Sequence, residues 1–500
     1  MVSRIWSVGL NGISGYQISC ECDLSGGLPA FDIVGLPDAA VRESRERIRS
    51  AIKNCGFDFP MRRITVNLAP ADTKKEGALY DLPILLAVLA ASGQIQADFS
   101  DSVFIGEVAL DGTLRPVSGA LPCAAAAAEN RFPKIFVPFA NAPEAALAKG
   151  PVVFGVDSIQ ELIGFFRGER TIYPAEPNEN HLEQSYPVDF SEVRGQENAK
   201  RAMEVAAAGG HNLLMNGPPG SGKSMLARRL PTILPEMTFQ ESLQTTMLWS
   251  VAGMTDRFHP LVTERPFRAP HHTSTAVSLI GGGRDLHPGE ISLAHNGVLF
   301  LDEFPEFPRH TIDVLRQPLE DGFVTVSRAS GTVTFPCRFM LVAAMNPCRC
   351  GWYGHPSGRC RCTQTQVDAY IGRISGPMLD RIDICTHVRE VAFQDLNGRS
   401  TAEPSSAIRA RVNAAREIQK QRFAGTDVAC NAHMPASLIE RFCVLSGEEQ
   451  AMIRRAFDKF GMSARSYHKI LKIARTIADL ASSESITCRH IAEALQYRGL

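Results

Sequence analysis

The residues with the clearest chemical meaning form a glycine-rich segment that fits the pattern G-x-x-x-x-G-K-[ST]. Its glycines allow the backbone to aim N–H groups at phosphates, and a helix that opens near Lys223 would add the positive end of its dipole. We expect Lys223 to reach the β- and γ-phosphates and Ser224 to ligate Mg²⁺. The segment therefore predicts an ATP site made of Gly217, Pro218, Pro219, Gly220, Ser221, Gly222, Lys223 and Ser224.

Two further apolar runs end in polar side chains that suit ATP hydrolysis. The run from Gly297 to Leu301 ends in Asp302 and Glu303. We expect Asp302 to hold Mg²⁺, partly through water, and Glu303 to polarise the attacking water. Acids also occur at strand tips for structural reasons alone, but the pairing with Lys223 favours catalysis. The run from Arg338 to Ala344 is followed by Asn346, whose amide is expected to orient the same water.

Four cysteines within fifteen residues form the pattern C-x-C-x₉-C-x-C, at Cys348, Cys350, Cys360 and Cys362. Four thiolates suggest tetrahedral Zn²⁺ in a structural role, because they leave no open position for a catalytic water. The C-x-C spacing is tighter than that of common zinc fingers, so free thiols or a redox pair stay open as alternatives. The zinc interpretation predicts a closed insert over residues 348–362, directly after the strand that ends before Asn346.

These motifs require strands and helices around them. We expect a strand at Asn212–Met215 and alternating strands and helices from Val188 to Ala392, as in an α/β nucleotide-binding fold. Residues 1–170 predict an α+β domain with helices at Asp38–Cys55 and Asp81–Ala91, and the linker composition of 168–187 places a boundary near 185. From residue 405 the pattern is helical, with candidates at Ile408–Phe423, Ala436–Leu445, Glu448–Phe460, Ser466–Leu480 and Cys488–Tyr497. The expected domains are 1–185, 186–395 and 396–500.

Length, composition and charge limit the number of domains, the compartment and the kinds of partner that we expect. The chain of 500 residues is too long for one core and predicts about three domains. The number of cysteines, thirteen, is odd, and the first fifteen residues lack the apolar region of a signal peptide. We therefore expect reduced thiols and a cytoplasmic location. The longest apolar run, Leu82–Ala91, is too short to cross a membrane. Because the net charge is −1, binding to nucleic acid would have to come from local basic surfaces.

The order of these motifs resembles the AAA+ ATPases. Arg265 to His272, Gln317 to Gly322 and Met378 to Asp383 look like their magnesium-chelatase and MCM-helicase branch, and the whole chain resembles the bacterial YifB/ComM family. The resemblance implies an N-terminal domain related to the Lon protease and ribosomal protein S5, a P-loop core, a C-terminal helical lid and assembly into a homohexamer.

In such a ring each ATP site is completed by the neighbouring subunit. Arg381 matches the arginine finger, which would stabilise the charge that develops on the neighbour's γ-phosphate. The alternative is that Arg381 caps a helix or pairs with Asp380 or Asp383. Arg465 matches the second sensor arginine, and the sequence leaves open whether it acts in its own subunit or across the interface.

The expected substrate is DNA. Between the two ATP motifs we expect an insertion from Met254 to Pro288 that points into the ring pore, and a second hairpin from Gly322 to Pro336 beside it. Arginines on such hairpins can contact phosphates without reading the base sequence. The candidates are Arg265, Arg268, Arg284 and Arg328. The alternative is an ordinary solvated surface.

Four functions are compared on this basis. The leading one is an ATP-driven DNA motor that extends recombination intermediates by branch migration during natural transformation, with a recombinase as a further partner. The second is a chelatase-type motor subunit that remodels a protein. An ATP-dependent protease is disfavoured because Leu79 stands where the Lon family carries its serine nucleophile. A scaffold without catalysis is disfavoured by the complete set of ATPase residues.

Overall fold

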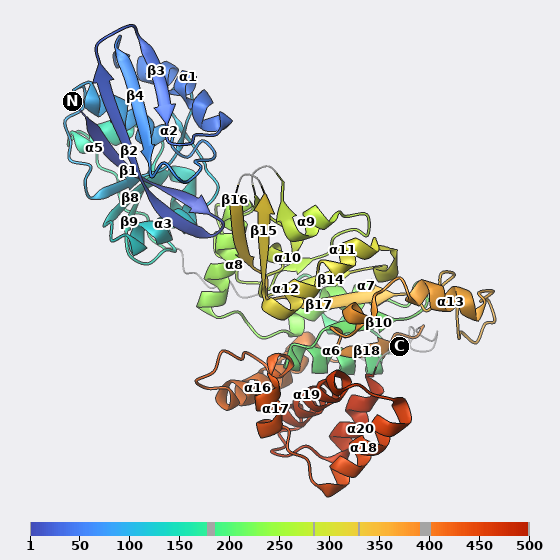
Figure 1. The fold of residues 1–500 in the computed structure, drawn as a ribbon. Helices are drawn as coiled ribbons and strands as arrows, with labels where there is room; N and C mark the ends of the chain where they lie inside the picture. The colour runs from blue at the N-terminus through green and yellow to red at the C-terminus, as the bar shows by residue number, and fades with distance from the viewer. Residues whose placement is uncertain (1, 178–185, 284–285, 329–330, 391–401, 499–500) are drawn as a thin grey trace.

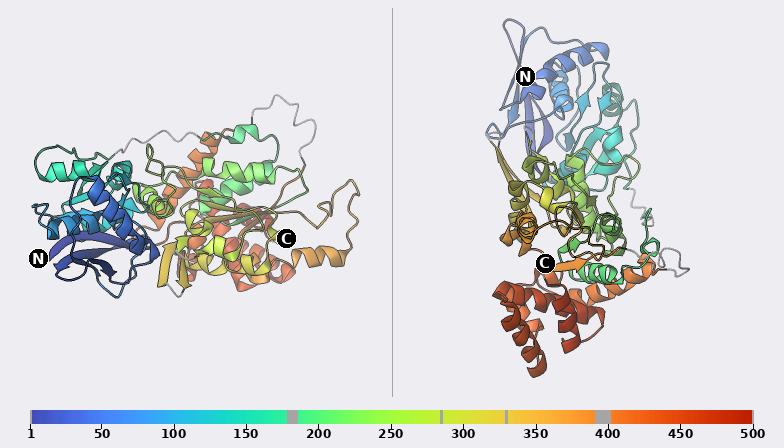
Figure 2. Two further views of the ribbon diagram at one scale, coloured as in Figure 1. Left: turned by 90° about the horizontal axis from the view of Figure 1, so that it is seen from above. Right: turned by 90° about the vertical axis from the view of Figure 1, so that its right-hand side faces the viewer.

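The computed structural model describes residues 2–177, 186–283, 286–328, 331–390 and 402–498. An N-terminal domain, a central core and a C-terminal helical domain follow one another along one axis (Figures 1 and 2). The expected boundaries after residues 185 and 395 lie outside the described residues, as does Arg284. No helix in the described ranges combines the length and the apolar character that a bilayer span needs.

The N-terminal domain is built on a seven-stranded sheet of order β3-β4-β2-β1-β5-β8-β9, which confirms the expected α+β class. The expected helices are present as α1 (Ala39–Asn54) and α2 (Asp81–Ala91). Asp38 begins α1 because its carboxylate accepts from Val41 N at 2.7 Å. The other helices, which the sequence interpretation missed, are α3 (Ala120–Glu129), α4 (Ala142–Ala145) and α5 (Ile159–Phe166). The strands are β1 (Ser3–Asn11), β2 (Ser14–Ser25), β3 (Ala30–Val34), β4 (Arg63–Ala69), β5 (Ser102–Phe104), β6 (Glu107–Val108), β7 (Leu114–Arg115), β8 (Lys134–Pro138) and β9 (Val152–Val156).

The core is a parallel five-stranded sheet of order β11-β14-β17-β10-β18. Its strands are β11 (Phe267–Arg268), β14 (Val298–Leu301), β17 (Met340–Met345), β10 (Leu213–Asn216) and β18 (Ile384–His387). The three strands predicted from apolar runs are present with ends shifted by two residues or fewer. Because β10, β14 and β17 are wholly buried between helices, their sequences are continuously apolar rather than alternating. The helices of the core are α6 (Glu197–Gly209), α7 (Lys223–Arg229), α8 (Phe239–Val251), α9 (Ala276–Ile280), α10 (Glu290–Leu293), α11 (Arg309–Asp313), α12 (Arg316–Asp321), α13 (Gln364–Ile371) and α14 (Gly376–Leu379).

The expected insertion from Met254 to Pro288 is wrong in its extent. It contains β11, which pairs with β14 as part of the central sheet. What leaves the core is a shorter ribbon, in which β12 (Gly281–Gly282) pairs with β13 (His287–Pro288). The expected second hairpin is confirmed as β15 (Phe323–Arg328) and β16 (Gly331–Pro336), and β15 lies against the first ribbon, since a Cβ at Gly282 would lie 3.3 Å from Val326.

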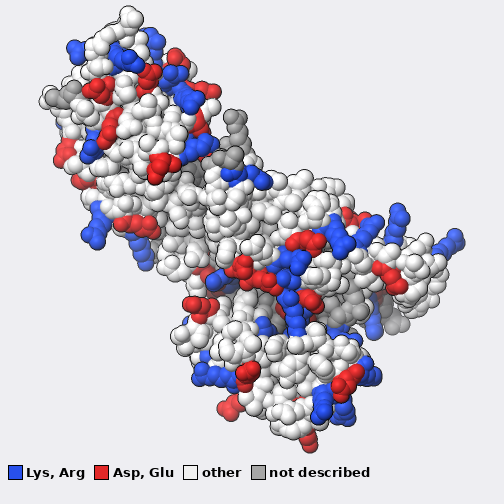
Figure 3. All heavy atoms as spheres, in the orientation of Figure 1, with Lys and Arg blue, Asp and Glu red and all other residues white. Residues whose placement is uncertain are grey.

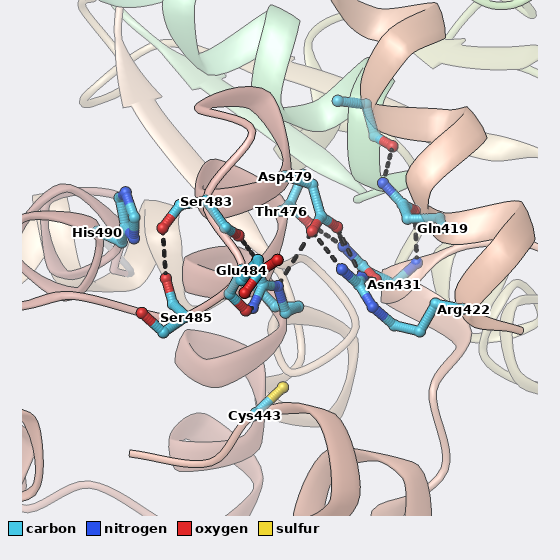
Figure 4. Close-up of polar contacts among 12 residues, drawn as sticks. Gln419, Arg422, Asn431, Cys443, Thr476, Asp479, Ser483, Glu484, Ser485 and His490 are labelled. Atoms are coloured by element: carbon cyan, nitrogen blue, oxygen red, sulfur yellow. Dashed lines mark hydrogen bonds and ion pairs between the residues drawn. The ribbon is translucent and has the colours of Figure 1, made fainter. Parts of the chain in front are cut away.

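The C-terminal domain is a helical bundle, as expected. Its helices are α16 (Ser405–Arg422), α17 (Ala436–Phe442), α18 (Gly447–Phe460), α19 (Ala464–Leu480) and α20 (Cys488–Gln496). A fully buried carboxylate, Asp479, organises its centre (Figure 4). Asp479 accepts from Arg422 at 2.5 and 2.7 Å, from Asn431 at 2.8 Å and from Arg475 at 3.1 Å. Gln419 links this bundle to the core, since its amide donates to Ala208 O of α6 at 3.0 Å.

The N-terminal domain is fastened to the core by a buried polar contact. Glu144, at the end of α4, accepts from the hydroxyls of Ser250 and Thr255, the latter at 3.0 Å. The β1–β2 turn also reaches the second hairpin, where a Cβ at Gly12 would lie 2.8 Å from Val333. The domain therefore contacts both α8 and the β15–β16 hairpin.

Candidate ATP site

The phosphate loop joins β10 to α7 and has the backbone geometry that its glycines permit. Gly220 and Gly222 have φ of +78° and +89°, which non-glycine residues rarely adopt. A Cβ at Gly217 would lie 2.2 Å from Val388 O, so this position also requires glycine. The Ser221 hydroxyl is buried and has no hydrogen-bond partner within the described ranges. The loop thus offers backbone N–H groups and a buried hydroxyl to a phosphate.

Lys223 is placed where the sequence predicts it, at the start of α7. Its ammonium donates to Gly217 O at 2.7 Å, to Pro218 O at 2.9 Å and to Asn346 Oδ1 at 3.2 Å. Burial lowers the pKa of Lys223, and the Asp302 carboxylate opposes that shift. The three oxygen atoms around the ammonium mark a position that β- and γ-phosphate oxygens can take over.

The two residues expected to hold Mg²⁺ are brought together. Ser224 Oγ donates to Asp302 Oδ2 at 2.6 Å, across the carboxyl ends of β10 and β14. A hydroxyl and a carboxylate at this distance suit a magnesium ion that keeps most of its water and binds one phosphate oxygen. Asn346 lies at the end of β17, between these two strands in the sheet, and contacts Lys223. The donor set therefore fits ATP with Mg²⁺.

Glu303 has a partner that the sequence interpretation missed. Its backbone is left-handed, with φ of +51°, and its carboxylate lies 2.9 Å from His272 Nδ1. His272 follows β11, the strand next to β14, and its ring packs against His271 with centroids 4.1 Å apart. The signal available in the sequence was the tandem His271-His272 shortly before the acidic motif.

Arg381 and Arg465 lie together. Arg381 lies near the amino end of β10, whereas the phosphate loop follows the carboxyl end of that strand. The Asn212 side chain, just before β10, donates to Arg381 O at 2.8 Å. The four residues of β10 separate this point from the loop by about 13 Å. Arg381 and Arg465 both pair with Glu320, at 2.5 and 2.8 Å. The structure thus brings the two arginines to one another and not to the Lys223 of their own chain.

The four cysteines converge as predicted. Their sulfur atoms all lie within 4.8 Å of one another. Sulfur–sulfur distances are 3.3 Å for Cys348–Cys350, 3.8 Å for Cys348–Cys360 and 3.6 Å for Cys350–Cys360. Tetrahedral thiolates around zinc at about 2.3 Å have sulfur atoms about 3.8 Å apart, so the cluster fits this ion.

The cysteine loop also contacts the phosphate loop. A Cβ at Gly351 would lie 2.5 Å from Pro219 Cδ. Gly351 has φ of +84° and lies between the first two and last two cysteines. The cluster therefore closes a loop that packs directly on residues of the ATP site.

The expected DNA contacts divide into two groups. Arg265 is turned inward, because its three nitrogen atoms donate to Pro235 O at 2.5 Å, Asn296 O at 2.6 Å and Glu236 O at 3.3 Å. Arg268 forms a two-point ion pair with Glu290 at 2.7 and 2.9 Å. These two side chains brace β11, and their intramolecular partners count against the predicted contact with DNA.

Arg328 differs from Arg265 and Arg268 in being exposed. It is exposed at the end of β15, and its guanidinium lies close to Gly282 of the neighbouring ribbon, where a Cβ would meet Nη2 at 3.5 Å. The two ribbons therefore present an arginine where β12 and β15 meet.

The structure shows what Leu79 does at the position where the Lon family carries its serine nucleophile. Leu79 packs against the two hydrophobic clusters of the N-terminal domain. Lys75 is buried and donates to Pro70 O and, at 2.7 Å, to Thr73 O. A hydrocarbon side chain here contributes packing in place of a nucleophile.

Comparison with known proteins agrees with this site. Three family models match consecutive parts of the chain: subunit ChlI of Mg-chelatase at residues 20–141, magnesium chelatase subunit ChlI at 189–396 and its C-terminal part at 402–498. Competence protein ComM of Haemophilus influenzae is 42% identical over 99% of this chain and 97% of its own. Protein YifB of Escherichia coli is 42% identical over 98% of this chain and 95% of its own. The magnesium-chelatase subunit ChlI of Chlorella vulgaris is 30% identical over 34% of this chain and 54% of its own. The chain therefore belongs to the YifB/ComM family of magnesium chelatase-like AAA+ ATPases.

Proposed function

We propose that this AAA+ ATPase assembles into a homohexameric ring and acts as an ATP-driven motor on DNA, moving branch points of recombination intermediates. The observation that supports the DNA substrate most directly is the pair of ribbons that leave the core side by side with Arg328 at their junction. A guanidinium on a projecting ribbon suits contact with phosphates of any sequence. A relative of similar length named for competence supports the proposed setting of natural transformation, with a recombinase as a partner.

The ring is supported by the separation of the catalytic residues. Lys223, Ser224, Asp302, Glu303 and Asn346 lie at the carboxyl ends of the strands, while Arg381 approaches the amino end of β10. An arginine that serves a γ-phosphate from that edge must serve the ATP of another subunit. Such a head-to-tail interface closes into a ring when its rotation divides a full circle. We therefore propose that Arg381 and Arg465 both act across the interface.

The test of the motor uses purified protein, ATP and a labelled four-way junction. We expect ATP-dependent conversion of the junction into duplex products and faster hydrolysis in the presence of DNA. Lys223→Ala, which loses phosphate binding, and Glu303→Gln, which loses the base, are the inactive controls. Arg328→Ala should weaken DNA binding and lessen its salt dependence while hydrolysis without DNA persists. Junctions left intact, together with hydrolysis indifferent to DNA, would reject a DNA motor.

We further propose that Cys348, Cys350, Cys360 and Cys362 hold structural Zn²⁺. When bound, the ion would neutralise thiolates and fix the loop that contacts Pro219. Elemental analysis of protein purified without added metal should find about one zinc per chain, and Cys360→Ser should lose most of it. Protein that is free of zinc and still binds ATP with full affinity would contradict this role.

A second candidate function is a motor subunit that remodels a protein partner, as in a chelatase. The match of all three family models to magnesium chelatase subunit ChlI favours it. A chelatase-type motor and a DNA motor would hydrolyse ATP in the same way, but a protein partner would stimulate hydrolysis in the first and DNA in the second. Hydrolysis accelerated by a protein partner and not by DNA would select this candidate.

A further inference from the structure

One carboxylate is shared by the two arginines expected at the neighbour's ATP. Glu320 Oε1 lies 2.5 Å from Arg381 Nη2 and 2.8 Å from Arg465 Nη2. Glu320 belongs to α12 and Arg465 to the first turn of the lid helix α19. Where Figure 1 draws α12 above α19, Figure 3 shows acidic and basic side chains gathered at the junction of core and lid. Three segments of two domains thus meet on one oxygen atom.

The two arginines differ in how firmly they are held. Arg381 is 10% exposed and uses all its nitrogen atoms within its own chain, since Nε donates to Arg316 O at 3.2 Å and Nη1 to Pro377 O at 2.6 Å. Arg465 is 46% exposed and donates to Glu320 from the domain surface. The contact to Pro377, in α14, also accounts for the helix-capping alternative considered for Arg381. The cap is made by the guanidinium itself, so action on the neighbour's γ-phosphate requires Arg381 to exchange one of these bonds for the phosphate.

Two guanidinium groups that converge on one phosphate repel one another before the phosphate arrives. A carboxylate between them removes most of that repulsion and fixes both side chains in advance. Partial burial raises the pKa of Glu320, but the hydrogen bonds from Arg465 and Arg381 outweigh that effect and keep its pKa below the ordinary value. Glu320 is therefore ionised at neutral pH, as this role requires.

We propose that Glu320 is a positioning residue for ATP hydrolysis in the neighbouring subunit, where its carboxylate holds Arg381 and Arg465 side by side for one γ-phosphate. This inference rests on the proposed ring. Because Glu320 and Arg381 lie in the core while Arg465 lies in the lid, the contact also makes arginine placement depend on the position of the lid. A lid that moves away removes Arg465 from the pair.

The direct test compares Glu320→Gln with the matched control Asp321→Asn. Asp321 is the next residue, exposed and acidic, so its variant makes the same chemical change one position away. Glu320→Gln should bind a fluorescent ATP analogue like the wild type and lower kcat about 100-fold, the scale of a misplaced catalytic group. Asp321→Asn should keep the wild-type kcat. Glu320→Asp, which keeps the charge with a shorter reach, should fall between the two.

Mixed rings separate positioning from a merely structural defect. Lys223→Ala subunits lack their own ATP but carry intact arginines, so adding them to Glu320→Gln should restore part of the hydrolysis. Adding Arg381→Ala should restore none. A Glu320→Gln protein with wild-type kcat, or one whose defect Lys223→Ala does not relieve, overturns the inference.

The same mixing experiment tests the ring independently. Arg381→Ala mixed with Lys223→Ala should regain hydrolysis if arginines act across the interface. Absence of recovery in that control mixture rejects the ring proposal itself, whatever Glu320→Gln does. Recovery in that mixture together with full activity of Glu320→Gln rejects the role of Glu320 alone.

Discussion

The imidazole of His272 holds the carboxylate of Glu303, with Nδ1 2.9 Å from Oε2. His272 lies at the carboxyl end of β11, on the way to the ribbon that carries β12 and β13. A carboxylate engaged by a histidine is less available to the water that it is expected to activate. The pair thus connects the segment proposed to approach DNA with the base of the ATPase reaction.

Replacing His272 with alanine should release Glu303. We expect hydrolysis without DNA to rise about fivefold, which corresponds to the loss of one polar contact of about 1 kcal/mol, and the stimulation by DNA to shrink. The measurement is steady-state ATP hydrolysis with and without DNA. His259→Ala is the matched control, because His259 is an exposed histidine in the segment that leads to β11. Activity as low as that of Glu303→Gln would instead show that His272 is needed to orient the base.

Gly351 should be more sensitive to substitution than its neighbour in the same loop. A methyl group at Gly351 would lie 2.5 Å from Pro219 Cδ, whereas Gly354 has nothing within 4 Å. Both have a left-handed φ, +84° and +74°, so both variants carry similar backbone strain. Gly351→Ala should therefore weaken ATP binding about tenfold by displacing the phosphate loop, and Gly354→Ala should not.

Nucleotide titration and metal content, measured on the same samples, check this prediction. Zinc should be retained in both variants, since neither removes a sulfur ligand. Equal ATP affinity in the two variants would show that the cysteine loop and the phosphate loop adjust independently.

The residues of the candidate ATP site whose place in the fold the sequence predicts correctly are those that belong to one short segment. The phosphate loop, the acidic strand end and Asn346 each follow a buried strand, so their place in the fold follows from the strand order. The lid helices were also predictable, because their apolar residues recur with helical spacing.

Contacts between distant segments could not be predicted in this way. No acidic residue occurs from Arg265 through Arg284, which favours a solvated or DNA-facing side chain, yet the donors of Arg265 meet the carbonyl groups of Pro235 and Asn296. A carbonyl partner leaves no trace in a sequence, because every residue has one. The expected insertion failed for a related reason, since β11 has only two residues and no readable strand pattern.

Asp479 should dominate the stability of the lid. It is fully buried and neutralised by Arg422 and Arg475. Asp479→Asn removes the charge but leaves two buried arginines facing an amide, a loss of about 3–5 kcal/mol. We expect a lower unfolding temperature and loss of Arg465-dependent hydrolysis. The control is Asp427→Asn, an exposed acid in the same domain, which should change unfolding by less than about 0.5 kcal/mol. Equal melting of the two variants would show that the network contributes little.

His295 should make the core sensitive to mild acid. Its ring lies at the end of α10, where Nδ1 accepts from Arg338 N at 3.0 Å. Burial, together with the nearby positive charge of Arg338, lowers the pKa of His295 from 6.5 to about 4. In the unfolded chain His295 therefore binds a proton below pH 6.5, whereas in the folded chain it stays neutral until about pH 4. The free energy of unfolding is unaffected by this group above pH 6.5 and falls by about 3 kcal/mol as the pH drops through that window.

The measurement is urea unfolding from pH 7 to pH 4, followed by the fluorescence of Trp249, whose indole donates to Leu293 O at 3.2 Å beside this site. The other two tryptophans, Trp6 and Trp352, are first replaced with phenylalanine. His295→Asn keeps an acceptor near the position of Nδ1 but cannot titrate, so its stability should fall less steeply over this range. His287→Asn, at an exposed histidine, should keep the wild-type slope. Identical slopes in all three proteins would mean that protonation of His295 does not limit the stability of the core.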